Sequence, residues 1–334
     1  MRKKSLFPIV IVFTTLFVLG YNSSSAQKVA PDTSYYEALP EKLTGRIYLS
    51  QKFAKFTIPS ENQTDIEYKA NTKLNLGIGV TYHNFSVNIF YGFAFLNKDD
   101  EKGKTKGLDL QLHLYPHKWA VDLLALFPKG LHLEPKGFGI SNPTKYYYRP
   151  DIKMTLFGIS AYRVPNKDKF SYRAAISQNE WQKRSAGSPL YGGTIYYGTI
   201  KGDSALVPKM LESSFPQKGI NNINYMAIGA GIGYAYTLVI DRHFFITASA
   251  VGNLDLTLTS EEGPTVAKQR KTSFGPSVVA KAAIGYNSPT WSVSLNGLGS
   301  AFWTKGDAST KQYYLPTGAL RLAVAKKFNV RKRK

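Results

Sequence analysis

The chain of 334 residues contains no cysteine. This absence excludes disulfide scaffolds, thiolate metal sites, cysteine nucleophiles and a lipid anchor attached to cysteine. The sequence also lacks an apolar run that could cross a bilayer as a helix, because such a helix needs about 20 apolar residues. The longest run, Leu6–Gly20, is shorter and is interrupted by Pro8, Thr14 and Thr15. A multi-pass helical membrane protein is therefore excluded.

Acidic residues are also few, with 22 Asp+Glu against 43 Lys+Arg, which gives a formal net charge of +21. The apolar content of 43% is nevertheless too high for a disordered chain. A basic chain often binds nucleic acid, but no interleaved aromatic and basic platform is present. We therefore expect no nucleic-acid partner.

The first segment has the order of a secretory signal peptide. Arg2, Lys3 and Lys4 are followed by the apolar run and then by the small residues Ser24-Ser25-Ala26. We predict cleavage after Ala26, so that residues 1–26 are the signal peptide; the alternative is an uncleaved anchor. Export also removes the chain from nucleic acid.

The remaining sequence alternates between apolar and polar residues over long stretches. In Lys106–Pro116, four leucines at every second position alternate with Asp109, Gln111 and His113. In Asn222–Ile240, bulky apolar residues alternate in the same way with Gly, Ala and Thr. A period of two indicates β-strands with one apolar face.

The length of these strands favours a membrane barrel over a soluble sandwich, which stays the alternative. Strands of soluble sheets average five or six residues, whereas membrane strands need about 9–11. Short joins such as Asp241-Arg242-His243 alternate with long polar segments such as Pro128–Tyr147. Aromatic residues recur near strand ends, as expected where rings lie at lipid headgroups.

The strand count is the least regular part of this prediction. We predict strands at 45–57, 68–82, 85–96, 106–116, 119–130, 149–164, 169–180, 190–201, 221–240, 244–258, 272–287, 290–303 and 313–328. These are thirteen strands, whereas a barrel with both termini in the periplasm requires an even number. Tyr191–Ile200 does not alternate, so we interpret Trp181–Gly219 as one outer excursion: a lid, a lumen plug or a solvated loop. The fold class is then all-β, an antiparallel transmembrane barrel of about twelve strands, with fourteen as the alternative.

The predicted organisation is a periplasmic segment at 27–43, a barrel at 44–328 and a basic tail at 329–334. In the last strand, Leu320, Leu322, Val324 and Phe328 share one face. Such an ending resembles the signal by which outer-membrane barrels are recognised, so we expect the barrel-assembly machinery as a partner. An ordinary amphipathic edge strand is the alternative.

The architecture resembles the outer-membrane β-barrels of Gram-negative bacteria across Thr44–Phe328. More narrowly, three stretches are similar to a barrel family catalogued only as a domain of unknown function: Asp32–Lys52 (DTSYYEALPEKLTGRIYLSQK), Arg149–Ile152 (RPDI) and Phe170–Gly193 (FSYRAAISQNEWQKRSAGSPLYGG). The resemblance implies a single outer-membrane barrel with no known activity and supplies no catalytic residues.

Catalytic and metal motifs are absent from the sequence. His113 is predicted to face the lumen beside Asp109, with Asp122 pointing inward from the next strand. Such a group is a base, half of a metal site or a hydrogen-bonded network. No HxH or HExxH motif accompanies His113. We expect no enzyme activity, no cofactor and no metal.

The other predicted lumen residues are charged. The candidates are Lys69, Lys73, Asp109, His113, Asp122, Arg173, Lys281 and Arg321. The excess of cations would favour anionic solutes, and the alternative is that the charges pair across the lumen. Basic outer loops could bind phosphates of outer-membrane lipid and lipopolysaccharide.

Three functions follow from these features. The leading hypothesis is a narrow passive channel or a structural component of the envelope, located in the outer membrane. The second is an outer-membrane enzyme acting on lipid or peptide, and the third is a surface-binding or partner module of an export complex.

Overall fold

The computed structural model describes the chain except for residues 1–31, 73, 83–84, 93–99, 117 and 331–334. The predicted signal peptide, the lumen candidate Lys73 and most of the predicted basic tail lie outside the described residues. No helix of the described part is long and apolar enough to cross a membrane.

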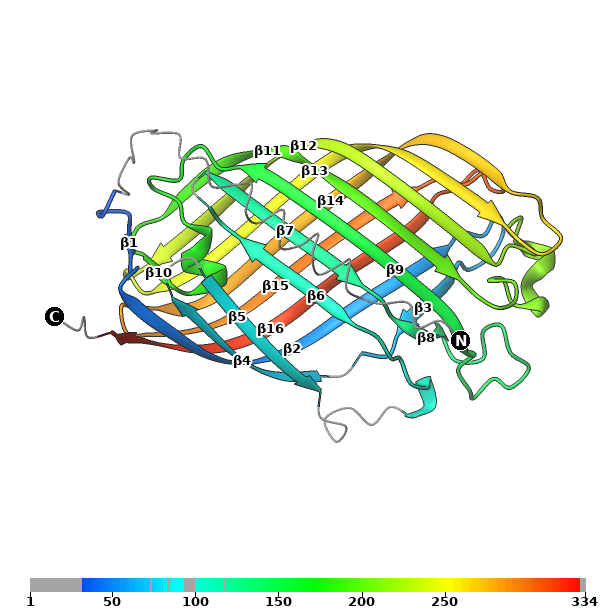
Figure 1. The fold of residues 1–334 in the computed structure, drawn as a ribbon, viewed down its shortest axis with the longest axis horizontal. Helices are drawn as coiled ribbons and strands as arrows, with labels where there is room; N and C mark the ends of the chain where they lie inside the picture. The colour runs from blue at the N-terminus through cyan, green and yellow to red at the C-terminus, as the bar shows by residue number, and fades with distance from the viewer. Residues whose placement is uncertain (1–31, 73, 83–84, 93–99, 117, 331–334) are drawn as a thin grey trace, which may run out of the picture. The chain divides into compact units, whose positions relative to one another are not determined.

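Ten antiparallel strands close a ring in the described part of the chain, which confirms the all-β barrel (Figure 1). In ring order they are β2 (Lys42–Ile58), β3 (Ile66–Ala70), β8 (Lys129–Glu134), β9 (Tyr148–Arg163), β11 (Ala186–Lys201), β12 (Asn222–Ile240), β13 (Phe244–Glu262), β14 (Gln269–Asn287), β15 (Trp291–Thr304) and β16 (Tyr313–Asn329). The last strand, β16, pairs with both β15 and β2. We call the end with the start of β2 and the end of β16 the near end, and the opposite one the far end.

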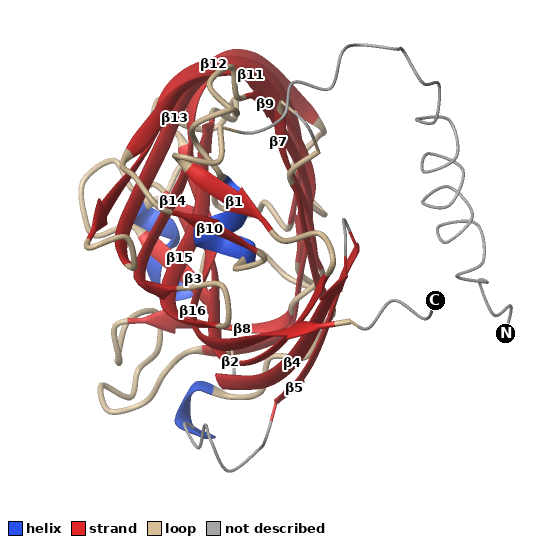
Figure 2. Cartoon of the chain, turned by 90° about the vertical axis from the view of Figure 1, so that its left-hand side faces the viewer, coloured by secondary structure: helices blue, strands red, loops and turns tan. Residues whose placement is uncertain are grey.

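Two hairpins branch from this ring. β4 (Leu74–Tyr82) pairs with β2 and carries β5 (Phe85–Gly92), while β7 (Trp119–Leu126) pairs with β9 and carries β6 (Asp109–Leu114). Both hairpins belong to the near-end half of the wall, and Figure 2 shows β4 and β5 at its lower edge. At the far end β3 pairs directly with β8.

The predicted count of twelve is therefore wrong for the ring, which has ten strands. The reason is that the predicted strands 68–82 and 119–130 each break in two. At the first break, Asn71 leaves the ladder and bonds through its backbone N–H to Thr105 Oγ1 at 2.8 Å. At the second, Pro128 has no N–H to donate and Gly130 adopts a φ of +84°.

Two further strand predictions are wrong in opposite directions. Tyr191–Ile200, which we excluded, lies in β11 and pairs with both β9 and β12. Its alternation is hidden because Gly192 packs against a neighbouring backbone, where a Cβ would lie 2.0 Å from Ala161 O. The predicted strand 169–180 instead contains η3, a π-helical turn at Arg173–Ser177. Trp181–Gly219 is thus not one outer excursion, since the wall strand β11 lies within it.

The wall has its apolar side chains outside and its polar side chains inside. On β13, Leu254 is 62% exposed while the adjacent Asp255 is fully buried. The same alternation follows β12, where Ile232 is 77% exposed and Ala235 and Thr237 are buried. This is the reverse of a soluble fold, in which water covers the polar face.

The far half of the lumen contains a packed apolar core. The loop after β11 contributes Leu206 and Phe215, which are almost completely buried and lie on either side of η4 (Lys209–Ser214), a turn without buried residues. They belong to a cluster with Phe56, Ile58, Ile66, Tyr68, Leu131, Leu133, Ile152, Tyr225, Phe302 and Tyr313. Tyr68 OH donates to Leu206 O at 2.6 Å, so the loop is fixed to the wall as well as packed.

The near half is filled by residues 166–185, which we call the plug. It contains η3 and β10 (Glu180–Gln182), and β10 pairs with β1 (Tyr36–Ala38) of the N-terminal segment (Figure 2). Asn287 Nδ2 donates to Ala174 O and to Glu180 O, both at 2.9 Å. Burial raises the pKa of the Glu180 carboxyl, against the opposing effects of Arg173 and of a hydrogen bond from Ser171.

Candidate functional site in the lumen

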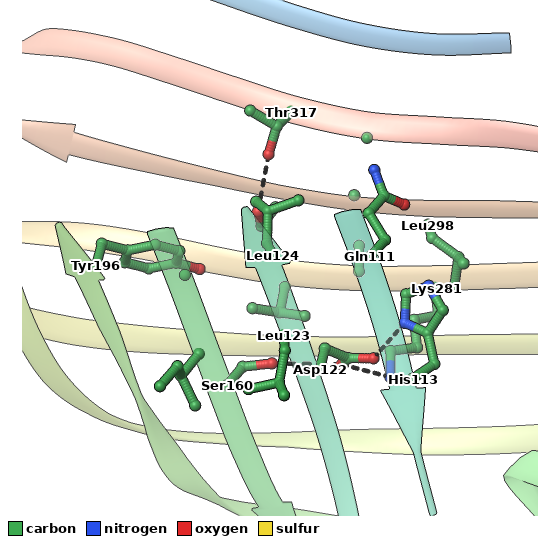
Figure 3. Close-up of a pocket in the computed structure, with 17 residues that line it drawn as sticks. Gln111, His113, Asp122, Leu123, Leu124, Ser160, Tyr196, Lys281, Leu298 and Thr317 are labelled. Carbon is green, nitrogen blue, oxygen red and sulfur yellow. Dashed lines mark hydrogen bonds and ion pairs between the residues drawn. The ribbon is translucent and has the colours of Figure 1, made fainter. Parts of the chain in front are cut away.

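The most concentrated polar chemistry lies between the far-half core and the plug, around Asp122. Asp122 Oδ1 is 2.7 Å from His113 Nδ1, and Asp122 Oδ2 is 2.7 Å from Lys281 Nζ (Figure 3). Ser160 Oγ also donates to Oδ2, at 3.3 Å. Three of the predicted lumen residues are thus brought together in one cluster.

The local strand pattern explains why these side chains meet. In β6, the leucines at 110 and 112 are exposed, which leaves His113 on the inward side. His113 and Asp122 are directly opposite in the β6–β7 register, whereas Lys281 comes from β14. Only the closure of the barrel brings β14 to this carboxylate.

Lys281 is held by aromatic rings as well as by the acid. Its Nζ lies 5.0 Å from the ring centroids of both Tyr115 and Tyr172, which are stacked on each other. Tyr172 belongs to the plug, and its hydroxyl is 2.6 Å from Ser249 Oγ. The cation therefore joins the wall to the plug through cation–π contacts.

A second ion pair crosses the same region. Lys52 Nζ of β2 is 3.0 Å from Asp109 Oδ1 of β6. Lys281–Asp122 and Lys52–Asp109 together support the alternative that lumen charges pair with one another.

Lys52, Arg46 and Tyr48 are lumen residues that the sequence analysis did not identify, although the alternation of residues in β2 indicates their inward positions. Ile47 and Phe53 are exposed on its outer face, and the missed residues alternate with them on the buried side. Arg46 Nη1 donates to Ser177 O of the plug at 2.5 Å. Arg321 does lie on the inward side, where its guanidinium is 5.4 Å from the Tyr48 ring centroid.

Two predicted lumen residues are placed elsewhere. The prediction that Lys69 faces the lumen is wrong, because Ile66 and Tyr68 occupy the buried side of β3. Lys69 instead forms ion pairs with Glu67 and Glu134 at the far end. Arg173 is not on a wall strand, since it lies in η3 and pairs with Glu180 at 3.4 Å.

Two small cavities adjoin the cluster. One of about 70 Å³ is lined by His113, Asp122, Lys281 and Tyr196, and one of about 50 Å³ by His113, Gln178 and Arg321. About 10–15 Å³ of such space is enough for one water molecule, so these cavities suit a few waters. His113 Nε2 and Gln178 Oε1 are buried and have no hydrogen-bond partner among the described residues, as expected of groups that bond to such waters.

The chemistry open to this arrangement is limited. No group of three or more His, Cys, Asp or Glu side chains suited to a metal ion occurs in the described part of the chain. The Asp122 carboxylate is already engaged by Lys281, His113 and Ser160. The cluster can hold water and fasten opposite walls.

The family model described as "Domain of unknown function (DUF4421)" matches residues 30–324. No curated protein matches the chain. Among solved structures, the outer membrane protease OmpT from Escherichia coli is 11% identical, with 87% of this chain and 98% of that chain covered and a TM-score of 0.36. Ail of Yersinia pestis is 8% identical, with 86% and 99% covered and a TM-score of 0.21. At such TM-scores these likenesses say nothing about function.

Proposed function

The chain belongs to the DUF4421 family, whose function is unknown, and we propose that it is an outer-membrane β-barrel that serves the envelope as a closed structural component. The observation that carries this proposal is a barrel with an apolar exterior and a lumen filled from both ends. We further propose that it is exported with cleavage near Ala26.

The exterior supports insertion into a bilayer. Large apolar side chains project outward from neighbouring strands, among them Ile228, Ile232, Leu254, Phe274 and Ile284, each more than half exposed. Contiguous apolar surface of this extent is rare on soluble monomers. Pairing along the closed ring also satisfies the backbone hydrogen bonds of the ten ring strands, which lipid cannot.

The interior supports a closed barrel over a passive channel. A solute entering at the far end meets the apolar core around Tyr68 and Phe302, and one entering at the near end meets the plug. The two cavities that reach His113, at about 70 and 50 Å³, are far smaller than the 300–1,000 Å³ typical of ligand pockets. A larger hollow of about 710 Å³ also touches Lys281, but its lining includes the exposed outer-face side chains of Tyr234, Tyr236 and Leu320. These observations therefore support a structural component of the envelope better than a passive channel.

We also propose that the chain is not an enzyme. Its most base-like group, the His113–Asp122 pair, adjoins cavities that suit water and not a lipid or peptide substrate. Lys281 further occupies the carboxylate that would orient the imidazole.

As partners we propose outer-membrane lipid and lipopolysaccharide, together with the barrel-assembly machinery. The basis for the latter is the exposed apolar face of β16, formed by Leu320, Leu322, Val324 and Phe328. No nucleic-acid partner is proposed.

Two measurements test the proposal. Cell fractionation with a heat-modifiability gel should place the chain in the outer membrane, with an unheated fast-migrating band; a periplasmic protein without that band would refute the barrel in the membrane. The purified barrel should then show no conductance steps in planar bilayers, and steady conductance would refute the closed barrel. Turnover of labelled lipid or peptide that is lost in His113→Ala would refute the absence of enzyme activity.

A further inference from the structure

Four lysines lie side by side on the outer face of the wall near its far end: Lys106, Lys129, Lys153 and Lys201. We call them the lysine row. Lys106 and Lys129 exchange backbone hydrogen bonds of 2.8 and 2.6 Å. Lys129 is directly opposite Lys153 in the β8–β9 register, and Lys153 is directly opposite Lys201 in the β9–β11 register.

The side chains of the row are exposed on the outer face. Ile152, Met154 and Ile200 are buried in the lumen, and strand alternation turns Lys153 and Lys201 the other way. Like charges directly opposite each other destabilise a sheet. A row of four in register is therefore a cost that the fold alone does not explain.

No carboxylate offsets this charge in the part of the chain that is described. None of the four lysines has an ion pair with a described acid, although Lys55, Lys69, Lys102 and Lys136 at the same end do. The carboxylate that precedes Lys153 on the same strand, Asp151, is engaged at both oxygens by Arg149, at 2.7 Å each.

The lysine row lies at the edge of an apolar band, which begins on the near-end side of the row. Along β9 the outward positions are Lys153, Thr155, Phe157 and Ile159, and along β11 they are Lys201, Thr199, Tyr197 and Ile195. The ring of Phe157 lies 5.3 Å from that of Phe127 and 6.4 Å from that of Tyr197. Lysines thus come first, then an aromatic row about 13 Å further along the strand, then aliphatic residues.

This order is the one expected at a membrane surface. Aromatic rings lie at the boundary between headgroups and hydrocarbon, and lysines just beyond it meet lipid phosphates. We propose that the lysine row binds the phosphate groups of an anionic lipid in the outer leaflet. The inference rests on the proposed membrane location, because the long far-end loops face the cell exterior on that reading.

The test compares two variants that lose the same charge at the same end. The row variant is Lys129→Gln/Lys153→Gln/Lys201→Gln. The control is Lys145→Gln/Lys209→Gln/Lys218→Gln, three exposed lysines in far-end loops that are not in register. The mature chain is kept in an uncharged maltoside detergent, and the probe is bisphosphorylated lipid A, with its dephosphorylated form as the matched ligand. Bound lipid is counted by native mass spectrometry.

The wild type and the control should bind lipid A, and the row variant should bind it about a hundredfold more weakly. Without lipid, the row variant should unfold at the same temperature as the wild type or at a higher one, because like-charge repulsion has been removed. Equal binding by the row variant, an equal loss in the control, or equal binding of the dephosphorylated lipid would each overturn the proposal. So would displacement of lipid A by inorganic phosphate at the same concentration, which would indicate a free-phosphate site.

The experiments distinguish a failure of the lysine-row proposal from a failure of the proposed function. A chain that fractionates with the outer membrane and runs as a heat-modifiable barrel, yet shows no dependence on the row, refutes the lysine row alone. A chain without the barrel band refutes the proposed location first.

Discussion

Replacing Lys281 by Met tests whether the cross-lumen ion pair holds opposite walls of the barrel together. The Nζ–Oδ2 distance of 2.7 Å corresponds to about 6 kcal/mol of attraction at an effective dielectric constant of 20, before the opposing cost of desolvation. The Lys281 side chain is 6% exposed and that of Asp122 is 17% exposed. Removing one partner leaves a buried charge, so Lys281→Met should lower the free energy of unfolding by about 3–5 kcal/mol.

The double variant Lys281→Met/Asp122→Asn separates the ion pair from simple loss of packing. It should recover at least about 2 kcal/mol relative to the sum of the single variants, because neither charge stays buried. The assay is urea unfolding in phosphatidylcholine vesicles, followed by tryptophan fluorescence. The control is Lys271→Met on the same strand, where the ion pair with Asp307 is exposed. This control should lower the free energy of unfolding by less than about 1 kcal/mol. Additive single-variant effects would refute the coupling that we infer.

Three further predictions concern the two ends of the lumen. Phe302→Ala should cost about 3–5 kcal/mol in the same assay, because the ring is buried in the far-half core, whereas Phe274→Ala on the exposed outer face should cost less; equal losses would contradict this placement of the core. Asn287→Ala should speed trypsin cleavage within the plug, because two buried backbone carbonyls lose their donor, and an unchanged cleavage rate would refute that role. Since burial raises the pKa of the Glu180 carboxyl, its protonated form favours the docked plug; that stabilisation is complete below about pH 4.5 and is lost as the pH rises through the raised value. Plug cleavage in the wild type relative to Glu180→Gln should therefore increase with pH, and a constant ratio would contradict the raised pKa.

Much of the barrel could be predicted because strand alternation is a local property. The faces of β12, β13 and β14 follow directly from a period of two, and so do the inward positions of His113, Asp122 and Lys281. The same rule applied to β2 would have found Arg46 and Lys52.

The wrong strand predictions concern segments whose residue pattern does not reveal whether they form part of the barrel wall. Phe170–Ser177 is buried on nearly every side inside the plug, so its residues carry no clean two-faced signature. In β11 the outward Gly193 and the glycine beside it replace the bulky residues that mark a wall strand. The breaks that produce β3 and β8 depend on pairing between segments about 60 residues apart, which no local pattern contains.

The sequence by itself determined the class of fold, the outward apolar faces and the inward polar ones, because each depends only on neighbouring residues along a strand. Closure of the ring decided the rest. It brought Lys281 to Asp122, folded the plug and the far-end loop into the lumen, and aligned Lys106, Lys129, Lys153 and Lys201 across separate strands. Such contacts are set by the register between distant segments, and that register exists only once those segments pair in the sheet.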